Sequence, residues 1–176
     1  MAVPGQGSEV PLWILGSSTF GAQLAAHLGL PFAFASHFAP QMMMQALQIY
    51  RQSFKPSEQL QQPHVMLGFN VVAAHTEAEA HLRASSLQQA FVNLRSGRPG
   101  RLPPPLAGYR ESLDPGASAL LDGVLSCAAI GAPETVRSQV NAFIERTGAD
   151  ELMITSQIFD PAARRESYSL LASVMA

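Results

Sequence analysis

The feature that most constrains the fold is a regular alternation of short apolar runs with longer segments of helical periodicity. The first apolar run, Leu12–Leu15, is followed after a short break by a helical pattern that ends at Gly29. A second apolar run, residues 30–36, begins at once. Two strands separated by one helix require a crossover connection and therefore a parallel pair. The alternation predicts an α/β fold.

The same strand-helix unit recurs along the rest of the chain. Residues 64–74 predict a third strand, which is apolar enough to be covered on both faces, and residues 151–158 predict a fourth. Gly131 is expected to make a turn between two helices. Apolar spacing and capping residues predict the helices, at 37–54, 76–94, 117–129, 133–148 and 160–175.

Residues 98–116 depart from this regular pattern. The segment holds five prolines, at positions 99, 103, 104, 105 and 115. Long irregular segments in compact domains tend to be functional or mobile. We therefore expect four parallel βα units with a Pro-rich insertion before the last strand.

Composition limits the classes of protein to consider. An apolar fraction of 47% in 176 residues indicates one globular domain spanning 1–176. The net charge of −2, without a basic run, gives no reason to expect nucleic acid or a membrane surface as a partner. The single cysteine, Cys127, cannot form an internal disulfide, so a cytoplasmic setting is expected. Without paired metal-ligand motifs such as CxxC or HExxH, no metal site is expected.

The break after the first strand, Gly16-Ser17-Ser18-Thr19, allows two interpretations. A glycine followed by hydroxyl groups at a helix N-terminus is suited to hold a phosphate, because free N–H groups and the helix dipole favour an anion. Ser and Thr are also the usual helix caps. The residues alone favour plain capping.

Polar residues near the ends of the other strands are the remaining candidates. Ser36 and His37 directly follow the second strand, and Asn70 is the one strongly polar member of the third. His37 is either a ligand contact or a capping or surface histidine. Asn70 is either a satisfied core residue or one that faces a pocket. No residue is identified as a catalytic base, because no carboxylate pair or Ser-His-Asp order stands out.

Four segments together resemble one known family. Residues 11–18, 24–40, 130–136 and 148–156 are similar to the corresponding stretches of the luciferase-like flavin-dependent monooxygenases, which include bacterial luciferase and alkanal-monooxygenase-like proteins. The resemblance covers nearly the whole chain.

This resemblance implies a TIM (β/α)8 barrel that takes reduced FMN as co-substrate, with a flavin reductase as a partner, and uses O₂ to oxygenate a small organic substrate. In the family, the turn after the fifth barrel strand helps to hold the FMN phosphate. That turn corresponds here to Gly16, Ser17, Ser18 and Thr19, so the resemblance favours the phosphate interpretation. Ser36, His37 and Asn70 are the residues expected near the flavin ring or substrate.

The chain departs from the family in length. Four predicted strands in 176 residues correspond to the C-terminal half of a barrel. Four strands cannot close, so the sheet would expose its edges and an apolar face. We therefore expect a homodimer or pairing with a separate N-terminal half. The alternatives to an active enzyme are a non-catalytic flavin- or phosphate-binding half barrel and a dimerisation module.

Overall fold

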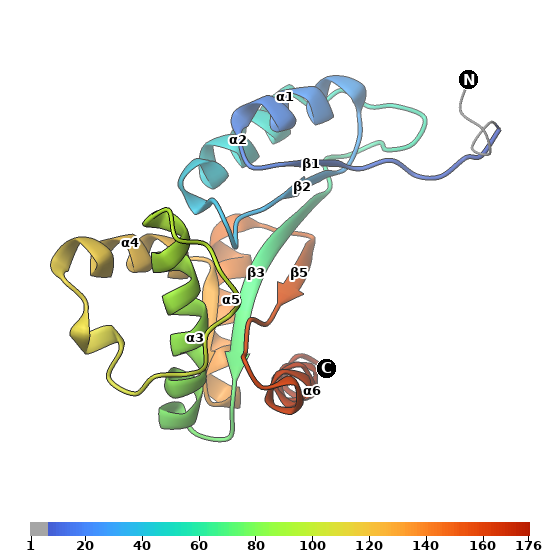
Figure 1. Cartoon of the computed structure of the whole chain (residues 1–176). Coiled ribbons are helices and arrows are strands. Elements are labelled where there is room, and N and C mark those ends of the chain that lie inside the picture. The colour runs from blue at the N-terminus through green and yellow to red at the C-terminus, as the bar shows by residue number, and fades with distance from the viewer. Residues whose placement is uncertain (1–6) are drawn as a thin grey trace.

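Strands and helices alternate along the chain (Figure 1). The structure, a computed structural model, describes residues 7–176, so the first six residues of the expected domain lie outside it. The strands are β1 (Ile14–Gly16), β2 (Phe32–Phe34), β3 (Val65–Ala73), β4 (Ala128–Gly131) and β5 (Glu151–Thr155). The helices are α1 (Thr19–Leu28), α2 (Met43–Ser53), α3 (Glu77–Arg95), α4 (Pro115–Leu125), α5 (Pro133–Thr147) and α6 (Pro161–Met175), with short 3₁₀ helices η1 (Pro40–Met42) and η2 (Arg110–Ser112).

The strand pairings are parallel, which confirms the α/β prediction. β1 pairs with β2, and β2 pairs with residues 65–67 of β3. On its other edge, β3 pairs with β5 over residues 66–70. The four expected strands therefore lie side by side in the order β1-β2-β3-β5, and β3 runs past its neighbours (Figure 1).

The expected count of four strands was wrong by one. Residues 128–131 form β4, whereas residues 117–129 were expected to be helical and Gly131 to make a turn. α4 instead ends at Leu125. β4 pairs with residues 70–73, the part of β3 that extends beyond β2. Four apolar residues show no periodicity that separates a strand from a helix, so only the hydrogen bonds to β3 decide the structure.

The Pro-rich segment lies between α3 and α4 and is irregular apart from η2. It is tied to α3 by two hydrogen bonds. The backbone N–H of Leu106 donates to Oγ of Ser85 at 2.8 Å, and Nε2 of Gln89 donates to the carbonyl of Pro104 at 2.9 Å. The insertion is therefore held against α3 rather than extended into solvent.

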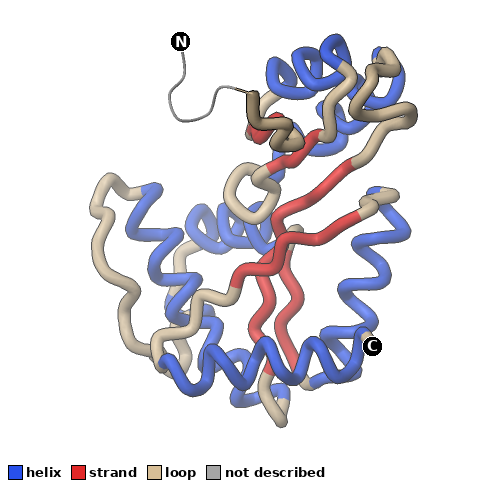
Figure 2. Tube along the Cα trace, turned by 90° about the vertical axis from the view of Figure 1, so that its right-hand side faces the viewer, coloured by secondary structure: helices blue, strands red, loops and turns tan. Residues whose placement is uncertain are grey.

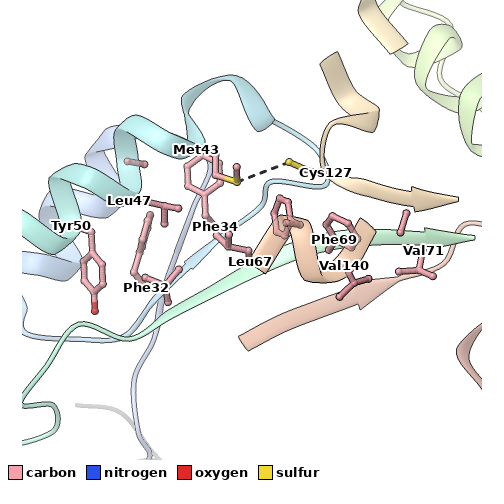
Figure 3. Packing of buried hydrophobic residues seen from close by; sticks show 14 of the residues in the cluster. Phe32, Phe34, Met43, Leu47, Tyr50, Leu67, Phe69, Val71, Cys127 and Val140 are labelled. Carbon is pink, nitrogen blue, oxygen red and sulfur yellow. Dashed lines mark hydrogen bonds between the residues drawn. The ribbon is translucent and has the colours of Figure 1, made fainter. Parts of the chain in front are cut away.

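One face of the sheet forms the main core. Phe32, Phe34 and Leu67 are at most 1% exposed and pack in one cluster with residues of α1, α2, α5 and α6. Figure 3 shows this row of side chains continuing along β3 to Val71. At one end, the Tyr50 hydroxyl donates to the Leu30 carbonyl at 2.9 Å, which ties α2 to the segment before β2.

The opposite face is only partly covered, and the tube view shows the sheet with helices around it (Figure 2). Leu15, Ala33 and Met66 are partners in register across β1, β2 and β3, and Met153 on β5 is the register partner of Gly68, on the same face of the sheet. Leu15 is 72% exposed and Met153 54% exposed. We call these four residues the open face. α3 covers the neighbouring carboxyl-terminal part, where Val72 packs against Ala84.

Three further features bear on the class of protein. Within residues 7–176, no helix is long and apolar enough to cross a membrane, and no group of His, Cys, Asp or Glu side chains is arranged to hold a metal ion. Cys127 is buried in the main core, and this burial raises the pKa of its thiol. A buried, protonated thiol is a packing group rather than a nucleophile.

Candidate functional site

The candidate site is a cavity of about 480 Å³ between the open face, the segment after β2 and α3. The side chains that line it are mainly apolar, with His37 and Gln157 as the polar members. Its lining includes Leu15, Phe38, Met66, Phe91 and Met153. The cavity therefore extends from the open face to the segments that follow β2 and β5, and the carboxyl ends of the strands are where βα-barrel proteins place their ligands.

The turn after β1 directly follows Leu15, which lines the cavity, but Gly16, Ser17, Ser18 and Thr19 are not among the residues that line it. The backbone N–H of Ala35 donates to the Gly16 carbonyl at 2.9 Å, which fixes the start of the turn beside the end of β2. Gly16 also faces Gly21 on α1. A Cβ on Gly21 would lie 3.3 Å from the Cα of Gly16. The two glycines thus let α1 begin close against its own strand.

Ser18 stands at the N-cap position of α1 but makes no side-chain hydrogen bond to the helix. The first turn of α1 contains no acidic residue. Thr76 behaves differently, because its Oγ1 accepts from the backbone N–H of Glu79 at 3.2 Å and caps α3. The capping interpretation therefore does not describe the Ser18 hydroxyl, which is exposed together with Ser17. The phosphate interpretation of Gly16, Ser17, Ser18 and Thr19 stays a prediction.

His37 is the site residue that lines the cavity, and a glycine makes room for it. A Cβ on Gly68 would lie 1.9 Å from Nδ1 of His37. Within residues 7–176, this nitrogen is buried and has no hydrogen-bond partner. A glycine inside a strand pattern often marks a place where another group packs closely against the backbone. Gly68, inside the third apolar run, carries this signal in the sequence.

Ser36 and Asn70 lie behind His37 rather than in the cavity. Both are fully buried. Oγ of Ser36 donates to the Gly68 carbonyl at 2.6 Å, and Nδ2 of Asn70 donates to the His37 carbonyl at 3.0 Å. The Thr155 hydroxyl donates to Oδ1 of Asn70 at 2.6 Å. These bonds join β2, β3 and β5 around the backbone of His37, so Ser36 and Asn70 position it.

Burial lowers the pKa of the His37 imidazole from its ordinary value of 6.5. The cause is desolvation, which disfavours the charged form. At neutral pH the ring is therefore uncharged, with one nitrogen able to donate a hydrogen bond and the other able to accept one.

The cavity also uses apolar residues that the sequence did not single out for it. Phe38, Phe91 and Met153 are part of its apolar wall. Gln157, two residues beyond the end of β5, supplies its second polar group. An apolar residue in a strand or helix is equally consistent with core packing, so no local signal separates these cavity-lining residues from core residues.

Comparison with known protein families gives a match over almost the whole chain. The family model described as luciferase-like monooxygenase matches residues 1–175. A protein of Escherichia coli (strain K12) named luciferase-like monooxygenase is 46% identical over 172 residues, which are 98% of this chain and 51% of the relative. The uncharacterized protein YvbT of Bacillus subtilis (strain 168) is 42% identical over 98% of this chain and 52% of its own length.

Solved structures show the same fold. The crystal structure of apo-MsnO8 superposes with a TM-score of 0.84 at 32% identity, covering 98% of this chain and 53% of that one. The oxygenating constituent of 3,6-diketocamphane monooxygenase from Pseudomonas putida, solved in complex with FMN, gives a TM-score of 0.59 at 18% identity over 98% of this chain and 49% of that one. The chain thus spans about half the length of the relatives that it matches.

Proposed function

The chain belongs to the luciferase-like monooxygenase family, and from this premise we propose that it binds FMN and takes part in the oxygenation of a small organic substrate by reduced flavin and O₂. The observation that carries the proposal is the Ser18 hydroxyl, which stands at the N-terminus of α1 without capping it, in the turn that directly follows the cavity-lining residue Leu15. The FMN complex of the structurally similar diketocamphane enzyme supports the choice of cofactor.

The turn after β1 fits a phosphate group. Ser18 is exposed and does not cap α1, so its hydroxyl and the first N–H groups of the helix can bind an anion without breaking an existing bond. The hydroxyls of Ser17 and Thr19 stand beside it in sequence. Gly16 and Gly21 keep this end of the helix close to the sheet. These residues would hold the phosphate of FMN.

The cavity beside the turn would take the flavin ring or the substrate. His37 is held there by Asn70 through its backbone carbonyl, and it is uncharged at neutral pH. It can therefore donate or accept one hydrogen bond without bringing a charge into an apolar cavity. Phe38, Met66 and Met153 would exclude water from the bound ligand.

Reduced flavin, when bound, supplies the electrons for O₂ chemistry, and the protein contributes position, polarity and the exclusion of water. A monooxygenase places one oxygen atom in the substrate and the other in water. The protein would receive its reduced flavin from a separate reductase. The buried, unpaired Cys127 is compatible with the reducing cytoplasm that we propose as its location.

The test is FMN binding, followed by flavin fluorescence, to the chain and to its Ser18→Ala variant. Because the Ser18 hydroxyl makes no capping bond, we expect Ser18→Ala to change the free energy of unfolding by less than about 0.5 kcal/mol. Its FMN affinity should fall about tenfold, since one charge-assisted hydrogen bond is lost. Riboflavin, which lacks the phosphate, should bind the two proteins equally.

Thr76→Ala is the matched control. It removes a hydroxyl that does cap a helix, so it should cost about 1 kcal/mol of stability and leave FMN affinity unchanged. Equal FMN affinity for the chain and for Ser18→Ala would remove the assigned phosphate site. FMN binding without substrate-dependent consumption of reduced flavin would instead indicate the non-catalytic half barrel.

A further inference from the structure

The open face is bordered at both ends of the sheet by exposed apolar surface. At one end, Phe20, Leu24 and Leu28 lie at i, i+4 and i+8 on α1 and are 70%, 36% and 47% exposed. We call them the α1 stripe. This spacing places all three on one side of the helix. The stripe flanks β1, which within residues 7–176 pairs on one edge only.

At the other end lies an apolar groove of about 450 Å³ between α5, β5 and α6. Leu152 and Ile154 form its floor, and Ile144, Tyr168 and Met175 are among its walls. Over the part of the chain that the structure describes, β5 also pairs on one edge only, with β3. The two ends of the sheet are thus of opposite shape, because one carries projecting side chains and the other a hollow.

We propose that two copies of this chain close one eight-stranded barrel, with the α1 stripe of each copy seated in the α5–β5–α6 groove of the other. Each copy supplies four adjacent parallel strands in the order β1-β2-β3-β5, so two copies supply eight. β1 of one copy then lies beside β5 of its partner, and a two-fold axis along the barrel makes both junctions equivalent. Eight parallel strands are the number that closes a barrel of this class.

The exposed surface area of the chain is consistent with an interface to a second copy. The chain exposes 9788 Å², roughly 1,500 Å² more than expected for a compact monomer of its mass of 18.8 kDa. Residues 7–13, which are exposed, contribute part of this excess. A standard interface removes about 800 Å² from each partner, which is about half of this excess.

The character of the open face favours a second copy of the chain. Its four residues, Leu15, Ala33, Met66 and Met153, are uncharged, so two such faces can meet without burying like charges. Glu151, at the amino-terminal rim, pairs with His64 at 2.7 Å.

Closure would also complete the candidate site. The turn at Gly16–Thr19 follows β1, and Gln157 follows β5. With β1 of one copy beside β5 of the other, the partner's Gln157 comes next to the turn that we assign to the phosphate. This consequence depends on the proposed function. The barrel closure itself does not depend on it.

The test is the mass of the purified chain, measured without flavin by gel filtration with light scattering. We expect twice 18.8 kDa. Phe20→Glu, in the α1 stripe, and Tyr168→Lys, in the groove, should each give monomers. Met44→Glu is the control. Met44 is 48% exposed on α2 and belongs neither to the α1 stripe nor to the groove, so this variant should stay dimeric.

Mixing the two monomeric variants, Phe20→Glu and Tyr168→Lys, separates interface loss from misfolding. In a mixed pair, one junction keeps both native residues, and the other brings the introduced carboxylate of one variant against the introduced ammonium group of the other. We therefore expect the heterodimer in native mass spectrometry. A native chain that is monomeric, or a dimer that both end variants leave intact, would overturn the proposal. A monomer that instead binds an added N-terminal half of the E. coli relative would assign the open face to that half.

Discussion

Replacement of Gly68 by alanine tests the packing on which the position of His37 depends. A Cβ at this position would lie 1.9 Å from Nδ1 and 2.7 Å from Cε1 of the imidazole. Ordinary contacts between non-bonded atoms are about 3.5–4.0 Å, so the ring has to move by roughly 1.5 Å or leave its place. The backbone φ of Gly68 is not positive, and the clash with His37 is therefore the source of strain.

Overpacking of this kind costs about 1–3 kcal/mol. In a protein of this size, 1 kcal/mol corresponds to about 2–4 °C in Tm. In a His37→Ala background the space is empty, so the same Gly68→Ala change should be neutral or stabilise by up to about 1 kcal/mol, because alanine restricts the unfolded strand more than glycine does. The two changes should therefore be coupled by at least about 1 kcal/mol.

The assay is urea unfolding of the four proteins of this double-mutant cycle, at one protein concentration. Gly123→Ala is the control. A Cβ on Gly123, inside α4, meets no atom within 4 Å, so this variant should be about 1 kcal/mol more stable. If Gly68→Ala costs the same with and without the His37 side chain, the imidazole does not lie against Gly68 and the description of the cavity is wrong.

Three further predictions concern pH and the joint between α2 and α5. Burial lowers the pKa of His37 from 6.5, so the unfolded chain binds a proton at this residue before the folded chain does as the pH falls. The free energy of unfolding should therefore decrease below pH 6.5, and urea unfolding at several pH values should show a smaller decrease for His37→Gln. Glu166 acts in a more acidic pH range, because its hydrogen bond from Arg83 lowers its pKa from 4.5. Its contribution to the free energy of unfolding is present above pH 4.5 and is lost as the pH falls further. An Arg83→Met variant with the same pH dependence of stability in this range would contradict this. Arg51 donates to the carbonyls of Thr147 at 2.8 Å and Gly148 at 2.5 Å, at the C-terminus of α5; Arg51→Met should cost about 1 kcal/mol in thermal unfolding, and Arg51→Lys should restore only part of it.

Several features of this protein follow from its sequence. The apolar runs and helical spacing identified β1, β2, β3 and β5 and their parallel order, because strand and helix periodicities are set by residues near one another in the chain. The four matching segments identified the family. The apolar strands of half a barrel also predicted a sheet face without its own cover, and Leu15 and Met153 are exposed there.

Other features were decided by tertiary structure alone. β4 is a strand because it meets the free part of β3. Asn70 and Ser36 are positioning residues because their partners, the carbonyls of His37 and Gly68, lie more than 30 positions away in the chain. Gly68 leaves space for the imidazole of His37, which is 31 positions away in the chain and packs against it. Local periodicity determines which segments are strands and helices, whereas contacts between distant residues exist only once the sheet has assembled.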